Sequence, residues 1–464
     1  MAKNVSKSVQ TEAEALYFLG NRRMTHGDAA GAEACFREAL RIHPEFAEAC
    51  GNLGLMLERR GVIDDAENCY RRALTLNPKL AELHLNLSAL LIRQKCLTEA
   101  ELVCQHALAL TPQSPAAWSN LGAVYACLQR EAEAEACYRH AIELDNQHVS
   151  SRFNLGYLLL RQGQFEEGWH CLEARDWYAA LAARLDCPRW QGEALAGKSV
   201  LIGYEAGHGD MIQFCRYAAV LKAQGASRVD IICHPALATL FATLDGADAI
   251  YPFDQPYPHT GWDYWSPPMS LPYYCETRLD SVPAAIPYLH ADPARVAQWR
   301  ALLPQHGIRV GLVWKGNPKF ENDADRSLPN LSVLAPLRTV PGVAFVSLQK
   351  IYAEDEAARL AAEWPLLELG SSMADFADTA AIVENLDLVI CIDTAVAHLA
   401  GALGRRCWVM LPDYKTDWRW LTGRSDSPWY PQSMRLFRQS VPGDWAGVAD
   451  RLTVALKAFV AGCR

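Results

Sequence analysis

The stretch CIDTAVAHLAGALG, Cys391–Gly404, decides how the carboxyl-terminal part of this chain folds. An apolar run, Leu388–Ile392, ends at Asp393 and Thr394, and small and apolar residues then recur at helical spacing as far as Gly404. The pattern predicts a strand, a tight turn and a helix. Because the first amides of a helix lack internal partners and carry the positive end of its dipole, the turn suits an anion such as phosphate. A purely structural crossover between strands is the alternative.

Strand and helix patterns alternate on both sides of an interruption in the carboxyl-terminal part of the chain. Strands are predicted at 198–203, 229–233, 249–253, 310–314, 343–348, 388–392 and 407–411, the last being the final strand, and helices at 235–244, 376–385, 395–403 and 445–460. This alternation predicts two Rossmann-like domains that face each other across a cleft. The segment 257–288, rich in proline and aromatic residues, is expected to form an ordered lid or wall.

A second turn follows the strand predicted at Lys198–Gly203. Gly207 and Gly209 flank His208 there, and Asp210 falls at the start of the next helix. Glycines permit sharp turns and close approach to a ligand, and ligands meet side chains at the carboxyl end of the first strand of an open parallel sheet. A ligand-facing carboxylate is therefore one reading of Asp210, and a helix cap is the other.

Polar side chains also follow two strands of the second half. Lys315, Lys319 and Arg326 lie in a loop from which each could reach a phosphate, and the sequence does not choose among them. Ser347 and Gln349 stand at the end of the strand at 343–348 and are suited to a base or a ribose.

The first third of the chain repeats with a period of 34 residues. The period is kept by small residues (Gly20, Gly54, Ser88, Gly122, Gly156), alanines (Ala32, Ala66, Ala100, Ala134), aromatic residues (Phe36, Tyr70, Tyr138) and prolines (Pro44, Pro78, Pro112). The small residues let paired helices approach, the aromatic fills the gap, and the proline ends the second helix.

This pattern resembles the tetratricopeptide repeat, with five units over about residues 13–175. The resemblance implies an α-helical solenoid whose concave face binds a peptide or protein. One position of the first helix is an amide that recurs with the same period: Asn52, Asn86, Asn120 and Asn154. Such a column can pair with the backbone of an extended peptide, or it can tie neighbouring helices together.

The predicted organisation is therefore α-helical followed by α/β. It consists of an N-terminal tail (1–12), the solenoid (13–175), a linker (176–197), a first Rossmann-like domain (198–304) and a second with a closing helix (305–464).

Three segments of the α/β part resemble the heptosyltransferase-like family of GT-B glycosyltransferases. They are Gly207–Asp210, Gly311–Trp314 and Asp393–Leu399, and the resemblance covers about residues 198–460. With the repeats in front, the layout resembles bacterial tetratricopeptide-linked transferases, including flagellin glycosyltransferases, and is similar to that of O-GlcNAc transferase. The resemblance implies a GT-B fold and an inverting, metal-independent transfer from a nucleotide sugar to Ser or Thr of a protein such as flagellin.

The resemblance also implies roles for individual residues. Asp210 would take the proton of the acceptor hydroxyl, His208 is a second acid/base candidate, and Gly207 and Gly209 would lie near the acceptor. Asp393, Thr394, Ala395 and His398 would lie near the phosphate and sugar of the donor. Lys315 or Arg326 would offset charge on the leaving phosphate. The family's catalytic lysine has no clear match, and the sequence leaves open the sugar, the nucleotide, the acceptor and the oligomeric state.

Composition excludes several other classes of protein. The net charge of −9 and the lack of a basic patch argue against nucleic acid as a partner. No signal peptide and no apolar run of about 18 residues is found, so a soluble protein without membrane insertion is expected. The fifteen cysteines are odd in number and include no Cys-x-x-Cys pair, which favours reduced thiols in the cytoplasm. No cofactor or metal is expected.

Two alternatives to protein glycosylation remain at this point. One is transfer to a saccharide or a lipid-linked acceptor, with the repeats used for docking. The other is a non-catalytic adaptor in which the transferase domain is degenerate, against which the joint presence of Asp210, Asp393, Thr394 and His398 argues.

Overall fold

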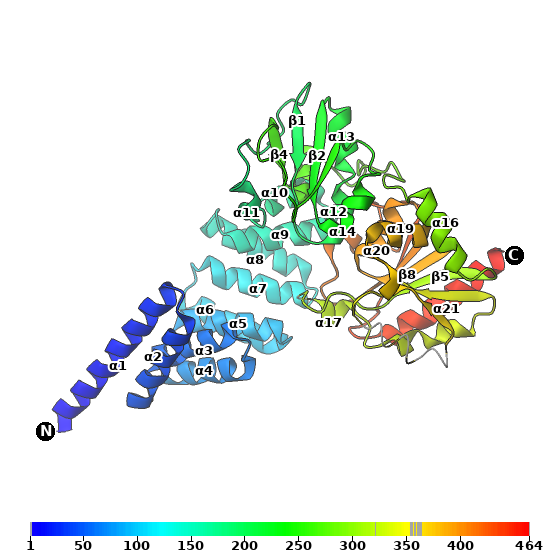
Figure 1. Ribbon diagram of the computed structural model, residues 1–464. Coiled ribbons are helices and arrows are strands. Elements are labelled where there is room, and N and C mark those ends of the chain that lie inside the picture. The colour runs from blue at the N-terminus through cyan, green and yellow to red at the C-terminus, as the bar shows by residue number, and fades with distance from the viewer. Residues whose placement is uncertain (1, 321, 353–355, 357–358, 360–363, 464) are drawn as a thin grey trace. The chain divides into compact units, whose positions relative to one another are not determined.

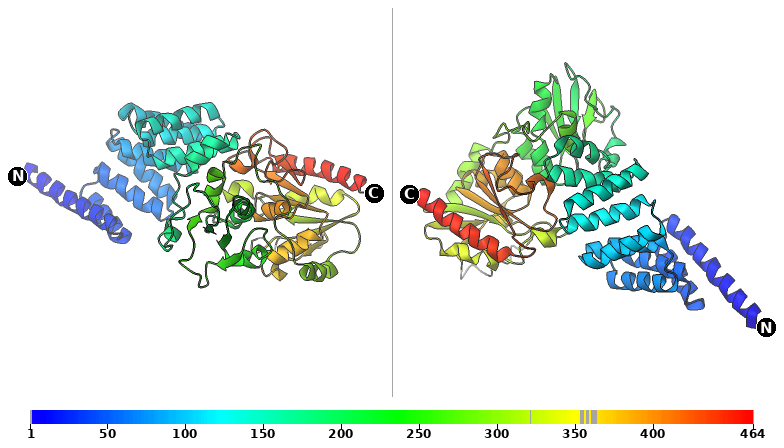
Figure 2. Two further views of the ribbon diagram at one scale, coloured as in Figure 1. Left: turned by 90° about the horizontal axis from the view of Figure 1, so that it is seen from above. Right: turned by 180° about the vertical axis from the view of Figure 1, so that it is seen from behind.

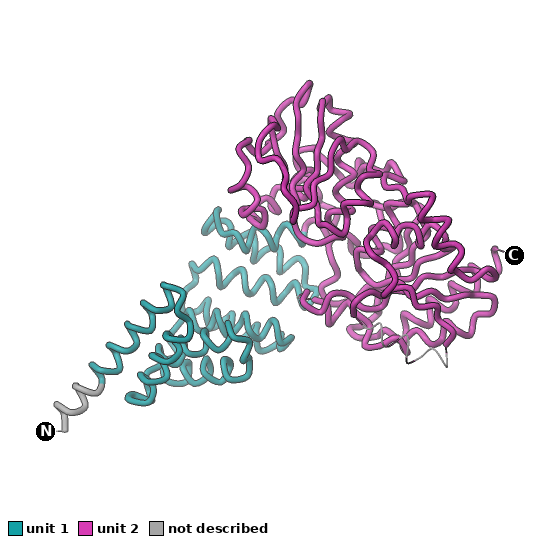
Figure 3. Tube along the Cα trace, viewed as in Figure 1, with its two compact units in different colours: residues 1–158 teal, residues 159–464 magenta. Residues whose placement is uncertain are grey.

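The computed structural model describes residues 2–320, 322–352, 356, 359 and 364–463, and of residues 2–9 it describes the backbone alone. The chain divides into two compact units, residues 1–158 and 159–464 (Figure 3). The predicted tail, 1–12, lies partly outside the described residues. The division between the units falls within helix α9 (Val149–Arg161).

The first unit is a series of antiparallel helix pairs (Figure 1). Its helices before α9 are α1 (Ala2–Thr25), α2 (Ala29–Ile42), α3 (Ala47–Arg59), α4 (Ile63–Leu76), α5 (Ala81–Arg93), α6 (Leu97–Leu110), α7 (Pro115–Cys127) and α8 (Glu131–Leu144). The predicted close approach of paired helices is confirmed. A Cβ atom on Gly20 would lie 2.6 Å from the ring of Phe36, and one on Gly122 would lie 2.6 Å from the ring of Tyr138.

The third repeat fills the same gap with a different pair of side chains. Ser88 stands where the other repeats carry glycine, and Cys104 stands where the first, second and fourth repeats carry an aromatic residue. Both side chains are completely buried. Ser88 is larger than the usual glycine, and Cys104 is smaller than the usual aromatic residue. The two changes compensate for each other, so α5 and α6 keep the distance between paired helices.

The second unit begins with the end of α9, then α10 (Phe165–Leu172) and α11 (Ala179–Ala182), and continues into a first parallel sheet. The sheet has the order β3-β2-β1-β4, with β1 (Ser199–Ile202), β2 (Arg228–Cys233), β3 (Ala249–Pro252) and β4 (Tyr264–Ser266). Its helical elements are α12 (His208–Phe214), α13 (Tyr217–Ala223), α14 (Pro235–Phe241), η1 (Pro268–Ser270) and α15 (Leu271–Tyr274).

A second parallel sheet has the order β10-β9-β8-β5-β6-β7. Its strands are β5 (Ile308–Val313), β6 (Val343–Ser347), β7 (Leu366–Glu368), β8 (Leu388–Ile392), β9 (Cys407–Leu411) and β10 (Met434–Arg438). Read from the β7 edge, the strands follow the order 3-2-1-4-5-6 of doubly wound dinucleotide-binding sheets. In such sheets ligands bind beyond the carboxyl ends of the strands, where the order reverses, which here is between β5 and β8.

Helices cover the second sheet on both faces. Its helical elements are α16 (Pro293–Leu302), α17 (Asp323–Arg326), η2 (Leu331–Thr339), η3 (Gly370–Ser372), α19 (Phe376–Glu384), α20 (Ala395–Ala402), η4 (Trp418–Trp420) and α21 (Trp445–Gly462). The core on one face joins α21 and η2 to the strands through residues such as Leu452, Leu334 and Ile390. Figure 2 shows α21, in red, running along this face of the sheet.

The structure corrects two of the predictions about strands. Cys407–Leu411 is not the final strand, because β10 follows it and pairs with it along its whole length. The segment 257–288 is not simply a lid, because it contains β4, which pairs with β1. Trp262 and Trp265 of this segment are buried in a cluster with Leu201 of β1, so the aromatic residues build the core of the first sheet.

Candidate functional site

The turn after β1 and the turn after β8 lie against each other. Helices α12 and α20, which follow these turns, pack together. A Cβ atom on Gly209 would lie 3.0 Å from Cδ2 of His398 and 3.4 Å from Cα of Ala395. A larger residue at position 209 would push the two turns apart, so the glycine permits their close approach. The structure thus brings together the two motifs that the sequence singled out.

Asp210 is held by two donors. Gly207 is the N-cap of α12, and its backbone N–H donates to Oδ2 of Asp210 over 2.8 Å. The other carboxylate oxygen, Oδ1, accepts a hydrogen bond from Nη2 of Arg419. The capping alternative is therefore realised, although Asp210 caps from inside the helix, and the same carboxylate forms an ion pair with a distant part of the chain.

Arg419 connects the segment after β9 to α12. The side chain is buried, and its Nε donates to Oε1 of Gln213 over 2.6 Å. Its Nη1 donates to Oδ1 of Asp417 over 3.0 Å. A single guanidinium thus fixes the carboxylates of Asp210 and Asp417 relative to each other. Neither Arg419 nor Asp417 was predicted, because both lie in an aromatic segment that has no recognisable pattern.

Asp393 is in a different electrostatic setting from Asp210. Burial raises the pKa of Asp393 to about 6, and the nearby carboxylate of Asp417 adds to the increase. The charges of Arg326 and Arg419 counteract part of this. The Asp393 carboxyl group therefore exchanges its proton close to neutral pH.

The first turn of α20 has groups available for a ligand. Thr394 is the N-cap, but its side chain makes no capping hydrogen bond. Its Oγ1 is buried and has no partner among the residues that the structure describes. Ala395, the first residue of the helix, lies against Gly209. A buried hydroxyl thus lies beside the first helical amides, at the turn where the sequence predicts an anion site.

His398 is a buried, neutral histidine. Its Nδ1 lies 2.8 Å from the hydroxyl of Tyr430, and its ring stacks on Trp420 with a centroid distance of 5.3 Å. Burial, followed by the charges of Arg419 and Arg216, holds its pKa well below the ordinary value. His398 thus offers hydrogen bonds and shape to the site but no positive charge.

His208 occupies the first position of α12 and packs between two other rings. Its centroid lies 4.6 Å from that of His234 and 5.3 Å from that of Phe376. Burial and the neighbouring His234 lower the pKa of His208 to about 4. The ring is neutral at physiological pH, and in that form it can accept a proton.

The three cations of the loop after β5 differ in their surroundings. Lys315 donates from Nζ to the carbonyl oxygen of Pro329 over 2.8 Å, and Lys319 is exposed. Arg326 pairs with Asp323 over 3.2 Å, and its charge acts on Asp393. Of these three residues, Arg326 is the one that the structure links to the turn after β8. Asp323 is itself buried.

Ser347 and Gln349 are buried and engaged within the protein. Oε1 of Gln349 accepts hydrogen bonds from the backbone amides of Trp314 and Lys315 over 3.1 and 3.0 Å. Its Nε2 donates to the carbonyl oxygen of Lys315 over 3.1 Å, and Oγ of Ser347 donates to Glu368 over 3.4 Å. Gln349 therefore shapes the chain where it leaves β5. These contacts place neither side chain at a base or a ribose.

The asparagine column of the first unit is partly used to join helices. Nδ2 of Asn52 donates to Oδ1 of Asn21 over 2.7 Å. Nδ2 of Asn120 donates to Oγ of Ser88 over 2.9 Å and to the carbonyl oxygen of Leu85 over 3.2 Å. At these two positions the structural alternative is realised. Asn86 and Asn154 are half-buried.

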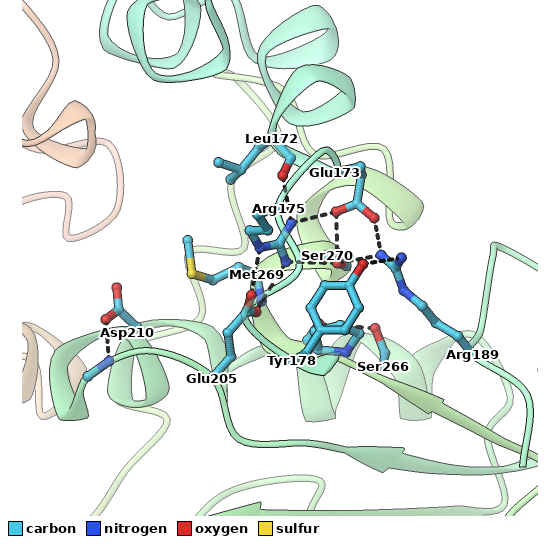
Figure 4. A network of polar contacts seen from close by, with 12 residues as sticks. Leu172, Glu173, Arg175, Tyr178, Arg189, Glu205, Asp210, Ser266, Met269 and Ser270 are labelled. Atoms are coloured by element: carbon cyan, nitrogen blue, oxygen red, sulfur yellow. Dashed lines mark hydrogen bonds and ion pairs between the residues drawn. The ribbon is translucent and has the colours of Figure 1, made fainter. Parts of the chain in front are cut away.

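A buried ionic network supports the loop that leads to Gly207 (Figure 4). Arg175, which follows α10, and Glu205, which follows β1, are both fully buried, and they form two hydrogen bonds of 2.6 and 3.1 Å. Arg175 also pairs with Glu173 over 2.8 Å and donates to Oγ of Ser270 over 2.9 Å. Buried charges need such complete pairing, so this network specifies the path of the loop. Its signal in the sequence is the glutamate two residues before Gly207.

Two further searches concern metals and membranes. Within the described ranges, no group of three or more His, Cys, Asp or Glu residues is arranged to hold a metal ion. The helices described here are also too short or too polar to cross a bilayer.

Models of the tetratricopeptide repeat match residues 17–61, 59–115, 115–148 and 137–170. Among curated proteins, the chain is similar to Protein FlbA of Caulobacter vibrioides (strain ATCC 19089 / CIP 103742 / CB 15). It is 30% identical to FlbA over 335 residues, which cover 66% of this chain and 54% of FlbA. The chain thus spans about half the length of this relative. Because the similarity covers more of the chain than the repeats do, it extends into the α/β part.

Two solved structures are similar to part of this chain. MamA from Desulfovibrio magneticus RS-1 is 19% identical, with 38% of this chain and 97% of that chain covered and a TM-score of 0.32. YrrB, described as a tetratricopeptide-repeat protein with an unusual peptide-binding site, is 19% identical, with 39% and 96% covered and a TM-score of 0.32. Residues 17–170 of this chain therefore carry tetratricopeptide repeats, and the second unit contains two parallel sheets with helices.

Proposed function

We propose that this protein is an inverting, metal-independent glycosyltransferase of the GT-B type. It moves a sugar from a nucleotide sugar to Ser or Thr of a flagellin-like protein that the repeats recognise in the cytoplasm. One observation carries the proposal. The turn that holds Asp210 lies directly against the first turn of α20, and Gly209 forms the contact. A candidate base and a candidate phosphate site therefore share one location at the carboxyl ends of β1 and β8.

In the proposed reaction the acceptor hydroxyl oxygen attacks the anomeric carbon of the sugar. The new C–O bond forms as the bond between that carbon and the phosphate oxygen breaks. Asp210 takes the hydroxyl proton, and Gly207 and Arg419 hold its carboxylate in place. Neutral His208, two positions earlier, is the second candidate for this proton.

The leaving phosphate carries the negative charge that develops. Thr394 Oγ1 and the first amides of α20 donate hydrogen bonds to it, and Arg326 supplies the positive charge. Asp393 stays close to this phosphate, where its raised pKa limits repulsion. His398 keeps α20 in place through Tyr430.

The first unit binds the acceptor. Asn86 and Asn154 pair with the acceptor backbone, whereas Asn52 and Asn120 join helices. Asn86→Ala is expected to raise KM for a protein acceptor and to leave slow donor hydrolysis unchanged. Asn120→Ala is the matched variant, because it breaks bonds to Leu85 and Ser88 and is expected to lower the free energy of unfolding by about 1 kcal/mol. Equal loss of transfer and hydrolysis in Asn86→Ala would contradict peptide binding by the column.

The decisive experiment offers purified protein and flagellin a panel of nucleotide sugars linked to UDP, GDP, ADP or CMP. We expect the intact mass of flagellin to rise by one sugar or a multiple of it with one of the donors. An adduct on an oligosaccharide or a lipid-linked acceptor alone would replace the protein acceptor in the proposal. If no donor gives an adduct or releases nucleotide, the enzyme proposal is refuted and the adaptor alternative stands.

A further inference from the structure

The turn between β1 and α12 contains a strained residue. Ala206 has a φ of 56°, which lies in the left-handed region that residues with a Cβ atom rarely adopt. Such a conformation persists only where the surrounding contacts require it, and it is often found at functional sites. The side chain of Ala206 is exposed, so its own packing does not hold the backbone there. The contacts made by the turn have to do so.

These contacts follow one another along the chain. Before Ala206, the fully buried carboxylate of Glu205 accepts two hydrogen bonds from Arg175. At Ala206 itself, the carbonyl oxygen lies 3.1 Å from Nε2 of His234. After it, the backbone N–H of Gly207 donates to the carboxylate of the proposed base. The strained residue is therefore held from both sides, and the ion pair with Arg175 supplies the strongest of the three contacts.

Arg175 reaches this turn from the last helix of the repeats. It follows α10, which belongs to the second unit and overlaps the last segment that the repeat models match. Trp169 of α10 is buried, and its ring packs edge-to-face on Trp418 with a centroid distance of 5.1 Å. Trp418 directly precedes Arg419, the partner of the proposed base. Helix α10 is thus anchored in the second unit, which gives Arg175 a fixed position from which to hold the turn.

We propose that Arg175 is a positioning residue for Asp210. Through Glu205 it keeps Ala206 in the left-handed conformation from which Gly207 meets the carboxylate, and Figure 4 shows Asp210 on the same loop as this ion pair. The inference rests on the proposed function and adds to it a residue from the end of the repeats. The side chain of Arg175 is fully buried, so it acts on the turn and not on a substrate.

The test uses the full chain with the substitution Glu205→Gln. The amide keeps the shape of the side chain, and Arg175 keeps its pair with Glu173, so the variant is expected to fold. We expect kcat for sugar transfer to fall by about tenfold or more, with the KM values for donor and acceptor within about threefold, because only the position of the base changes. Asp230→Asn is the matched control. It neutralises another fully buried carboxylate of the first sheet, which pairs with Arg228 over 2.7 Å, and kcat is expected to stay within about twofold.

Ala206→Gly separates positioning from a general loss of stability. Glycine adopts a positive φ without the steric penalty of a Cβ atom, so adding this substitution to Glu205→Gln is expected to raise kcat again by about fivefold. Hydrogen exchange of the amides of residues 205–214, followed by mass spectrometry, is expected to be about tenfold faster in Glu205→Gln than in the wild type. Thermal unfolding shows whether each variant is folded. Arg175→Lys, which keeps the charge without the paired geometry, replaces Glu205→Gln if that variant does not fold.

The outcomes separate this inference from the proposed function. A kcat that stays within about twofold of the wild type in the folded variant overturns the inference and leaves the proposed function intact. A lower kcat that the glycine does not raise also overturns it, because the loss then does not pass through the turn. A wild type that transfers no sugar, while Glu205→Gln still speeds exchange at the turn, refutes the proposed function and leaves only the support of the turn by Arg175.

Discussion

Asp210 and Asp393 occupy similar places in the two sheets and have opposite surroundings. Each follows the carboxyl end of a central parallel strand, and the turns that carry them are in contact. Asp210 forms an ion pair with the buried guanidinium of Arg419. Burial and the negative charge of Asp417 disfavour the ionised form of Asp393 and raise its pKa to about 6.

The difference separates the two residues by role. A carboxylate held by an arginine and a backbone amide is fixed in geometry, which suits the abstraction of a proton from a positioned hydroxyl. A carboxyl group that is partly protonated near neutrality tolerates an anion beside it. The contrast predicts that substitutions at the two positions change different measurable quantities and change stability with opposite signs.

The largest effect is expected for Asp210→Asn. The amide retains the shape of the side chain but cannot take a proton, so transfer at saturating donor is expected to fall by about 10²- to 10⁴-fold. The Kd for nucleotide should stay within threefold, because Asp210 is assigned to the acceptor. Asp426→Asn is the control, since Asp426 is exposed and pairs with Arg424. Retention of more than a third of the wild-type rate in Asp210→Asn would transfer the base role to another group, with His208 first.

The second largest effect is expected at Arg419, the arginine that forms an ion pair with Asp210. Arg419→Met leaves Asp210 and Asp417 without their shared cation, and the free energy of unfolding is expected to fall by about 3 kcal/mol. Urea denaturation of the full chain measures it. Arg424→Met, which breaks a pair at the surface of the same segment, is expected to cost less than about 1 kcal/mol. Equal losses in the two variants would mean that the burial of Arg419 contributes nothing to its pair.

Much of the fold follows from periodicity alone. The spacing of 34 residues determines which glycine packs against which aromatic ring. In a repeat of this kind the glycine of the first helix lies against the ring of the second helix, as Gly20 and Phe36 show. The long apolar strands such as β8 are buried from end to end and are easily recognised. Three short or polar strands were missed. β4 and β7 are each three residues long, and β10 carries the exposed side chain of Arg435 in its interior.

The site was predictable only in part. Turns that follow apolar strands are local features, so Asp210 and Asp393 could be found from the sequence. The partner of Asp210 could not, because Arg419 is 209 positions away and meets it only when the two sheets pack. Gln349 shows a contact that the sequence could not predict. It was predicted to face a base or a ribose, and in the structure its Oε1 accepts hydrogen bonds from the amides of Trp314 and Lys315.

Asp393→Asn tests the sign of the second carboxylate. The pKa of Asp393 is raised from 3.8 to about 6 in the folded chain, so between these values the folded state binds more protons than the unfolded state. Stability from this group is therefore present at low pH and lost as the pH rises through about 6. Asp393→Asn is expected to be more stable than the wild type at pH 7 by about 1–2 kcal/mol, a value reduced for partial solvent exposure. Urea denaturation at pH 7 and at pH 4 measures the difference in stability, which should disappear near pH 4. A variant that is less stable than the wild type at pH 7 would contradict this account.

The smallest effect is on donor affinity as a function of pH. Protonation of Asp393 removes a negative charge beside the proposed phosphate site, so a nucleotide sugar should bind about threefold more tightly at pH 5.5 than at pH 7.5. The phosphates of a nucleotide sugar are linked on both sides by ester or anhydride bonds and do not titrate in this range. His398 contributes nothing to the change, because its pKa lies well below the ordinary value and it stays neutral.

This measurement requires a chain that binds the donor without consuming it, which Asp210→Asn provides. Calorimetry in that background should give the threefold change, and the double variant Asp210→Asn with Asp393→Asn should give an affinity that does not vary with pH. If the double variant keeps the dependence, the titrating group is another residue near α20. If affinity instead rises with pH, the phosphate does not lie beside Asp393, and the division of roles between the two aspartates fails on the donor side while the result for Asp210 stands.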